Sequence, residues 1–319
     1  MLKAKHLRTL HVNPSVHPRG QAHLSAASGL VQVPSGTGVR CFVVSDDEHH
    51  LGQFKLGSDE PVKLKRLLGG DLPYGLMDRK AAKPDLEVLT LLPAMARYPH
   101  GALLALGSGS KPQRHTGLVM ALNAQGKLGK DEALVSQHLS LNALYAPLHA
   151  QFADLNIEGC FVQNDTLHLI HRGNKGSASG QSSAAIALHL PQFLAWLLEP
   201  DDTQPPVPSN TLNIDLGDVD GVPLTPTDAC LLPGDSQGRW LLSAAAENTD
   251  DSTLDGPCAA SALAVLSAQG KLLALHRLHG APKVEGISAT RHGSHIEVLM
   301  VTDADHPDVA SQLLSLRLP

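Results

Sequence analysis

The chain has 319 residues and a formal net charge of −6, with 25 Lys and Arg against 31 Asp and Glu. Because no basic stripe is interleaved with aromatic residues, this charge pattern excludes a phosphate backbone as a partner, and we expect no nucleic-acid binding. No run reaches the ~18 uninterrupted apolar residues of a membrane helix, and no apolar stretch long enough for a signal peptide follows the basic start. We therefore expect a soluble, cytoplasmic protein without membrane contact.

Short apolar runs of strand length, separated by Gly and Pro, follow one another along the chain. After a first strand at 6–12, the clearest strands are 39–44, 101–106, 166–170, 239–242 and 295–301, and the chain ends on a strand at 312–318. Leu144, Leu148 and Phe152 have helical spacing, which predicts a connecting helix over 142–152. Residues 199–210 are rich in Pro and Asp and predict a surface loop.

A repeat becomes visible when the strands are aligned. One short apolar segment precedes each central strand, and its start carries Ser28, Glu87, Glu158, Asp228 or Glu285, at spacings of 59, 71, 70 and 57 residues. These spacings are too long for one hairpin and suit a four-stranded sheet with its loops. Repeats of this kind bury their faces only against neighbouring repeats.

Five such sheets arranged radially form a five-bladed β-propeller, an all-β fold that leaves only short, protected edges. We expect one domain over residues 1–319, closed by pairing of the N-terminal strand with the C-terminal strand. The alternative is six blades, with the residues between His189 and Leu216 forming part of an extra sheet.

The innermost strand of each blade lines the central channel of a propeller, so acids at the repeat position would converge there. Like charges at close range raise one another's pKa, so protonation, water or a bound cation must relieve the repulsion. Calcium takes about 6–8 oxygen ligands, and this ring supplies carboxylates. We predict a calcium site at Glu87, Glu158, Asp228 and Glu285, with Ser28 as a neutral fifth member. The alternative is a structural role, in which the acids bind backbone amides of the adjacent blade or face a solvated channel.

A second group of polar residues follows the next strand of each repeat, where the chain emerges at one mouth of a propeller. The candidate ligand-binding residues there are Asp46, Asp47, Arg114, Arg172, Glu247, Asn248 and Asp303. Arg114 and Arg172 would bind an anionic or polyhydroxylated small molecule, while the acids position water or metal. The alternative is that these are ordinary polar loop tips, because Asp, Asn and Gly are favoured in turns for conformational reasons.

Three stretches carry a resemblance to a known family: residues 83–87 with 103–110, 156–159 with 169–173, and 283–287 with 301–303. They resemble an uncharacterised family of bacterial propeller proteins that is similar to esterase-like phytase domains and, more remotely, to calcium-dependent gluconolactonase and paraoxonase propellers. The likeness extends from about Ser28 to Leu318. It implies a propeller fold and channel acids as metal ligands, but no residue here matches a catalytic base.

Two hypotheses of different class follow. The first is a metal-dependent hydrolase of a phosphoester, ester or lactone at the propeller mouth, where the cation polarises the substrate and lowers the pKa of its bound water. The second is a non-catalytic propeller that binds a small ligand or a protein on one face, with a structural acidic channel.

Overall fold

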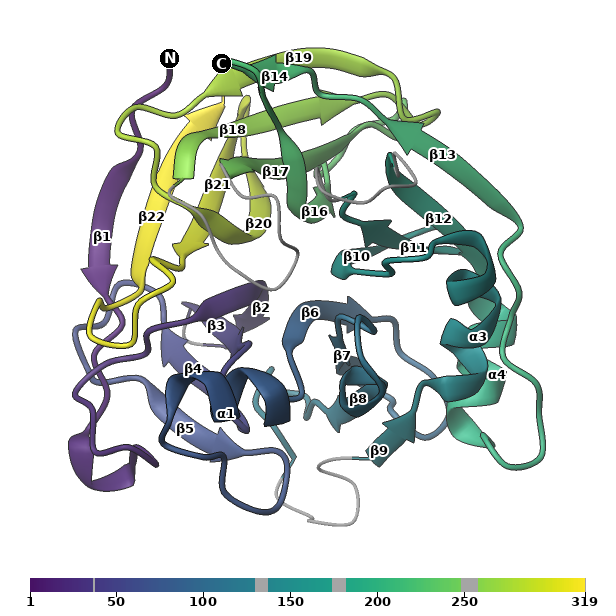
Figure 1. Ribbon diagram of the computed structural model, residues 1–319, viewed down its shortest axis with the longest axis horizontal. Helices are drawn as coiled ribbons and strands as arrows, with labels where there is room; N and C mark the ends of the chain where they lie inside the picture. Colours follow the sequence, from purple (N-terminus) through teal and green to yellow (C-terminus); the bar gives the residue numbers. More distant parts are fainter. Residues whose placement is uncertain (37, 130–136, 174–181, 248–257, 319) are drawn as a thin grey trace.

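The computed structural model describes all residues except 37, 130–136, 174–181, 248–257 and 319. Within the described residues, five four-stranded antiparallel sheets stand around a central axis and form a five-bladed β-propeller (Figure 1). The predicted fold is therefore confirmed. The six-bladed alternative is wrong, because the residues between His189 and Leu216 form a helix and the outer strand of the third blade.

The blades follow the chain, and each runs from an inner to an outer strand. The first blade contains β2 (Ala27–Ser35), β3 (Gly38–Ser45), β4 (His50–Lys55) and β5 (Lys63–Arg66). The second contains β6 (Leu86–Leu92), β7 (Ala102–Gly107), β8 (Thr116–Ala121) and β9 (Gln137–Ser140). The third contains β10 (Ile157–Gln163), β11 (Thr166–His171), β12 (Ser183–His189) and β13 (Asn210–Ile214).

The last two blades differ in how the chain completes them. The fourth contains β16 (Thr225–Leu231), β17 (Trp240–Glu247), β18 (Cys258–Leu266) and β19 (Leu272–Arg277), and a small hairpin of β14 (Asp218–Val219) and β15 (Val222–Pro223) precedes it. The fifth contains β20 (Val284–His292), β21 (His295–Thr302), β22 (Gln312–Leu318) and, as its outer strand, β1 (Lys5–Thr9). Lys5 is paired with Ser315 and Thr9 with Gln312. The N-terminal strand thus closes the ring, as predicted.

Each boundary between two blades is filled by its own apolar cluster. Adjacent residues of one strand supply opposite boundaries: Val43 packs toward the fifth blade, whereas its neighbours Phe42 and Val44 pack toward the second. Leu103 and Leu104 divide in the same way between the first and third blades. Because both faces of a blade are buried, these strands are continuously apolar rather than alternating.

Every inner strand contains a register shift near its start, where it pairs with the second strand of its blade. The shifts lie between Ala27 and Leu30, Leu86 and Val88, Ile157 and Gly159, Pro226 and Asp228, and Val284 and Gly286. Such bulges bend a strand and redirect a side chain. The repeat position is therefore a bulge, occupied by Glu87, Glu158 and Glu285 in three of the five blades.

The residue after the bulge controls how closely neighbouring inner strands approach. A Cβ added to Gly286 would lie 1.8 Å from the Ser28 carbonyl oxygen, and one added to Gly159 would lie 2.9 Å from Cα of Asp228. Glycine at these positions lets the backbone of the next blade occupy the space of a side chain. The Glu-Gly pairs of the third and fifth repeats thus join a channel-facing acid to a close contact between blades.

In the described part of the chain, three α-helices lie outside the blades. Helix α3 (Asn142–Gln151) confirms the predicted connecting helix and packs Leu144, Tyr145 and Leu148 at the boundary of the second and third blades. Helices α1 (Leu76–Ala82) and α4 (Leu190–Leu198) were not expected from the sequence. The predicted loop at 199–210 follows α4 and contains no helix or strand before β13.

None of the helices in the described part of the chain is both long and apolar enough to cross a membrane.

Candidate functional site

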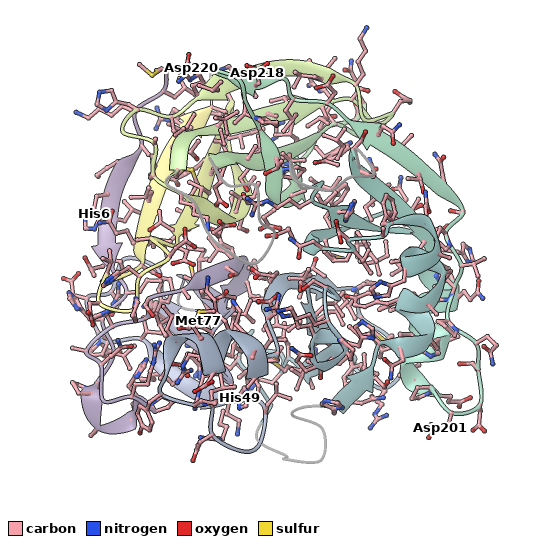
Figure 2. The ribbon with its side chains drawn as sticks, viewed as in Figure 1. His6, His49, Met77, Asp201, Asp218 and Asp220 are labelled. Atoms are coloured by element: carbon pink, nitrogen blue, oxygen red, sulfur yellow. The ribbon has the colours of Figure 1, made fainter. Side chains whose placement is uncertain are left out.

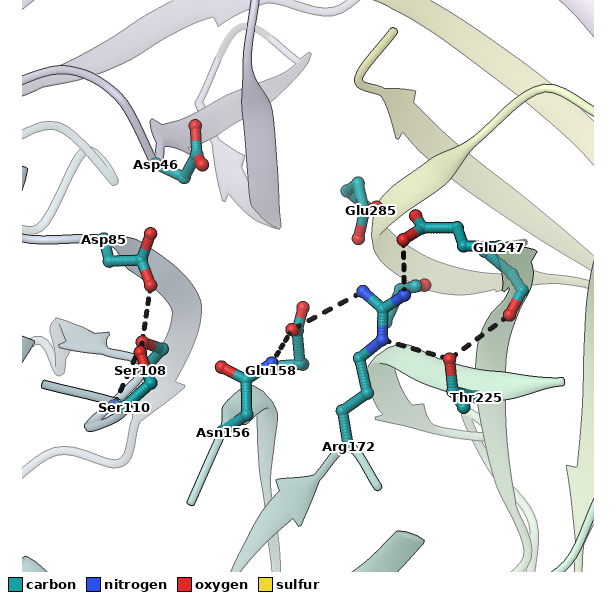
Figure 3. Close-up of polar contacts among 12 residues, drawn as sticks. Asp46, Asp85, Ser108, Ser110, Asn156, Glu158, Arg172, Thr225, Glu247 and Glu285 are labelled. Atoms are coloured by element: carbon teal, nitrogen blue, oxygen red, sulfur yellow. Dashed lines mark hydrogen bonds and ion pairs between the residues drawn. The ribbon is translucent and has the colours of Figure 1, made fainter. Parts of the chain in front are cut away.

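The inner strands begin and the second strands end at one mouth of the channel. One backbone hydrogen bond recurs there in four blades: the amide of Asp46 donates to the Ala26 carbonyl (3.1 Å), and those of Ser108, Arg172 and Asp303 donate to the carbonyls of Asp85, Asn156 and Lys283 (3.0, 2.9 and 3.1 Å). Because this bond recurs in four blades, the side chains that follow their second strands lie at a similar height along the channel axis. Figure 3 shows several of these side chains facing a common central space.

We call the charged side chains at this mouth the axial cluster. Its carboxyl groups belong to Asp46, Asp85, Glu87, Glu158, Glu247, Glu285, Asp303 and Asp305, and its cations to Lys83, Arg114, Arg172 and Lys283. Carboxyl groups outnumber cations two to one. Protonation or an additional cation must therefore relieve the repulsion.

Three of the cations bridge neighbouring blades. Lys83 contacts Asp46 of the first blade and Asp85 of the second, with 2.8 Å to Oδ1 of Asp85. Arg172 reaches from the third blade to Glu247 of the fourth, at 2.9 Å. Its Nε also donates to Thr225 Oγ1, at 3.0 Å.

Lys283 bridges the fourth and fifth blades. Its Nζ lies 2.9 Å from Glu247, 3.2 Å from Glu285 and 2.5 Å from Asp305. Arg114 acts within the second blade, where it donates to Asp85 (2.6 Å) and to Ser110 (2.8 Å). Buried ion pairs of this kind offset the cost of taking each charge out of water, and they fix the side chains that carry them.

Two boundaries between blades have no such cation among the described residues. At the boundary of the second and third blades, burial and then Glu158 raise the pKa of Glu87 well above its ordinary value. At the boundary of the fifth and first blades, burial and then Asp46 raise the pKa of Asp303 in the same way. At these two boundaries the raised pKa values of Glu87 and Asp303 favour their protonated, neutral forms.

The pKa values of the remaining acids are raised or lowered according to their burial and their charged partners. Burial raises the pKa of Glu158 to about 7, that of Glu285 to about 8 and that of Asp46 to about 6, although Arg172 and the lysines oppose these rises. Burial acts in the same direction on Asp85, but Lys83 and Arg114 hold its pKa below the ordinary value. The cluster therefore joins a firmly ionised carboxylate to carboxyl groups that titrate near neutrality.

One predicted metal ligand, Asp228, is held by backbone hydrogen bonds. The bulge of the fourth blade is Thr227, so Asp228 stands one residue out of register with Glu87, Glu158 and Glu285. Its two carboxylate oxygens accept hydrogen bonds from the backbone amides of Ala229 (2.7 Å) and Ile287 (2.8 Å). A shift of one residue turns a side chain to another face of the strand. Asp228 therefore reaches the backbone amide of Ile287 and links the fourth blade to β20 of the fifth.

The predicted mouth residues mostly gather as expected from the repeat. Asp46, Arg114, Arg172, Glu247 and Asp303 belong to the axial cluster. Asp47 lies beside it and forms an ion pair of 2.9 Å with Arg19, whereas Asn248 lies outside the described residues. Their role in ligand binding stays a prediction.

Asp46, Asp85 and Glu87 form a group that could hold a metal ion, because one oxygen from each lies within 4.8 Å of the others. Both oxygens of Asp85 already have partners, in Lys83 and in Arg114 with Ser108. Asp46 Oδ1 is buried without a hydrogen-bond partner among the described residues. Asp46 and Glu87 are therefore the two acids of this group whose carboxylate oxygens are available to a metal ion.

A pocket of about 230 Å³ opens beside this group, at the boundary of the fifth and first blades. Asp46, Asp303 and Asp305 line one side of it. Helix α1 and the residues before it supply Tyr74, Leu76, Arg79 and Lys80, and Arg19 and Lys83 add positive charge. The pocket thus combines acidic, basic and apolar side chains.

Lys83 and Lys283 were not singled out from the sequence, although a signal for both was present. Lys283 stands two residues before Glu285, and Lys83 two before Asp85. Residues two apart in an extended chain lie on the same face, so a lysine at this spacing is placed to neutralise the acid. No comparable sequence pattern indicated that residues of α1 would line the pocket.

The fold and the site define the class of protein: a five-bladed propeller with an acidic cluster at one mouth of its channel. Residues 79–307 match the model of a family described as a family of unknown function, DUF6910. Since the match spans most of the chain, the protein belongs to this family. No curated protein matches the sequence.

Solved structures that resemble the chain include a luciferin-regenerating enzyme, at 12% identity over 92% of this chain and 91% of that one, with a TM-score of 0.42. An exo-1,5-alpha-L-arabinanase from a bovine ruminal metagenomic library is 8% identical over 93% and 95% of the two chains, with a TM-score of 0.45. A Bombyx mori GH32 beta-fructofuranosidase is 10% identical over 92% of this chain and 61% of that one, with a TM-score of 0.45. Such low similarity does not indicate a shared activity, and the likeness to phytase and gluconolactonase propellers stays a prediction.

Proposed function

We propose that the protein is a metal-dependent hydrolase of a small ester, phosphoester or lactone, with its site at the acidic mouth of the propeller. The observation that supports this most is the group of Asp46, Asp85 and Glu87, whose oxygens lie within 4.8 Å of one another. Glu87 has no ion pair or hydrogen bond among the described contacts, and Asp46 Oδ1 is buried without a hydrogen bond. Burial first, and then the neighbouring acids, raise the pKa of Glu87, and a cation bound there would offset the repulsion among these acids.

Calcium fits this donor set, since it takes oxygen ligands in flexible geometry and fills its remaining positions with water. Asp46 and Glu87 would hold the ion. Asp85, fixed between Lys83 and Arg114, keeps its position by contacts that do not involve the ion. When bound, the ion would polarise a substrate oxygen and acidify a bound water.

The protein's own acids supply proton transfer. Glu158 accepts a hydrogen bond of 2.5 Å from Asn156 Nδ2 and lies 3.6 Å from Arg172, and its pKa of about 7 lets it exchange a proton at neutral pH. A catalytic acid or base works best when its pKa lies near the working pH. Glu158 is therefore the proposed general acid–base residue.

The adjacent pocket supports a small substrate with an anionic group. Arg19, Arg79 and Lys80 offer positive charge opposite Asp46 and Asp303, and Leu76 and Tyr74 offer an apolar wall. A volume of about 230 Å³ suits a small metabolite rather than a polymer segment buried along its length.

The alternative is a non-catalytic propeller that binds a small ligand, in which the axial cluster serves structure. The bridging contacts of Lys83, Arg172 and Lys283 favour this alternative, because they already neutralise much of the cluster and join the blades.

Turnover of an ester, lactone and phosphoester panel, with calcium and with chelator, separates the two functions. Calcium-dependent hydrolysis that falls about 10²- to 10⁴-fold in Glu158→Gln supports the hydrolase. Glu60→Gln is the matched control, since Glu60 is exposed and remote from the mouth. Absence of turnover on every substrate, or turnover unaffected by Glu158→Gln, would contradict it.

A further inference from the structure

Two histidines from different elements meet at the boundary of the second and third blades, outside the axial cluster. His115 follows the short 3-10 helix Pro112–Arg114 and directly precedes β8, and His149 lies in the last turn of α3. Their Nε2 atoms are 3.1 Å apart, and the ring centroids are 5.0 Å apart. The carbonyl oxygen of Gly109 lies 3.1 Å from Nε2 of His115 and is also a partner of His149. Two imidazole nitrogens and one carbonyl oxygen thus lie next to one another.

The protein holds this arrangement in place from several sides. Nδ1 of His115 lies 2.8 Å from Oδ1 of Asn142, an acceptor to which the Nδ1-protonated tautomer of His115 donates. In that tautomer the Nε2 lone pair is available to bind a metal ion. A second partner that fixes the tautomer in this way is typical of metal-binding histidines.

The position of Gly109 is fixed by its backbone conformation and by the Tyr145 ring. Its φ of +76° suits glycine, and a Cβ there would lie 2.7 Å from the Tyr145 ring. The Tyr145 hydroxyl donates to the Gly107 carbonyl at 2.8 Å, and the same ring stands edge-on to His115 with centroids 5.8 Å apart. Tyr145 thereby anchors the segment at Gly107, packs against Gly109 and contacts the His115 imidazole.

We propose that His115, His149 and the Gly109 carbonyl bind a first-row transition metal ion, with Zn²⁺ as the best fit. Two imidazole nitrogens bound to one zinc ion at about 2.0–2.1 Å lie about 3.3–3.4 Å apart in tetrahedral geometry, close to the 3.1 Å found here. Each neutral imidazole would bind the ion through Nε2 with its proton on Nδ1, and water would complete the coordination. Both imidazoles are partly exposed, so the ion has access from solvent.

The proposed zinc site has a structural consequence for the mouth of the channel. It joins α3 to the segment 107–115, which carries Ser108 and Arg114, the two partners of Asp85 Oδ2. Metal binding at this site would stabilise the segment that fixes Asp85. The proposal does not depend on hydrolytic activity or on calcium.

Titration calorimetry of the untagged full chain with Zn²⁺ tests the site. We expect one zinc ion per chain, loss of this binding in both His115→Ala and His149→Ala, and about 10- to 100-fold weaker binding in Asn142→Ala, which keeps both ligands. Co²⁺ should give a visible d–d spectrum with wild type and none with His149→Ala. His292→Ala is the control, because His292 is an exposed histidine that stacks on His295 at a distance from this site.

Glu87→Gln separates this site from the axial cluster, and it should leave zinc affinity unchanged. Zinc binding that survives His115→Ala or His149→Ala, or that is lost in Glu87→Gln, would overturn the proposal. If the histidine variants unfold, Asn142→Ala still decides: an unchanged zinc affinity in that variant contradicts the site.

Discussion

Lys283 and Glu285 lie two residues apart at the start of β20, and the lysine Nζ is 3.2 Å from Glu285 Oε1. The same ammonium group also contacts Glu247 of the fourth blade and Asp305 of the fifth. One cation thus pairs with two buried acids and with Asp305, and it joins two blades. This relationship makes the axial cluster part of the fold as well as a candidate site.

Replacing Lys283 by Met should destabilise the protein by about 3–5 kcal/mol, because it leaves buried carboxylates without their cation. Chemical denaturation measures the change. Lys271→Met, at an exposed position of the fourth blade, is the matched control and should change stability little. A Lys283→Met protein as stable as wild type would show that the contacts of Lys283 contribute nothing net.

The raised pKa values predict a fall in stability above neutral pH. The pKa values of Glu158 and Glu285 are about 7 and about 8 in the folded state, against an ordinary value of 4.5. Between pH 4.5 and these folded values, the folded chain therefore binds more protons than the unfolded chain. The free energy of unfolding therefore decreases as the pH rises through the folded pKa values, by at most about 1.4 kcal/mol per pH unit for each group. Below about pH 6.5 the buried His17, His50, His168 and His171, with pKa values lowered to about 4, act in the opposite direction.

The window from pH 6.5 to 8.5 is therefore diagnostic. Unfolding free energies measured across it should fall with rising pH in wild type and fall less steeply in Glu285→Gln, which removes one titrating group. Stability that rises with pH in this window would contradict the assignment of raised pKa values to these acids.

Gly286→Ala should destabilise the protein by about 3 kcal/mol or more, because the new Cβ would lie 1.8 Å from the Ser28 carbonyl oxygen and force the fifth and first blades apart. Thermal melts provide the measurement. Gly36→Ala serves as the control, since no atom lies within 4 Å of its added Cβ. Equal melting temperatures for the two variants would mean that the inner strands separate at little cost.

The blade count and the closing strand could be predicted because they depend on local signals. Two-sided burial makes runs such as Phe42, Val43 and Val44 continuously apolar, and Gly and Pro mark the turns between them. Helix α4 was missed because only His189 separates its first residue, Leu190, from the apolar run of β12, so no loop marks the boundary between strand and helix.

The site could be predicted only in part, because a bulge changes which residue faces the channel. Aligning acid with acid placed Asp228 in the ring, whereas the structure places Thr227 at that bulge. Asp46 and Glu87 come from different blades and are 41 positions apart, so their closeness follows from the closed ring rather than from any motif.

The central claim is a cation site at Asp46 and Glu87, and thermal melts of wild type and Glu87→Gln, each with calcium and with chelator, test it most directly. We expect calcium to raise the melting temperature of wild type, chelation to lower it, and Glu87→Gln to lose this dependence, while Glu60→Gln keeps it. If chelation leaves wild type unchanged and Glu87→Gln is more stable than wild type under both conditions, the acid is relieved by losing its charge rather than by binding a metal, and the claim is contradicted.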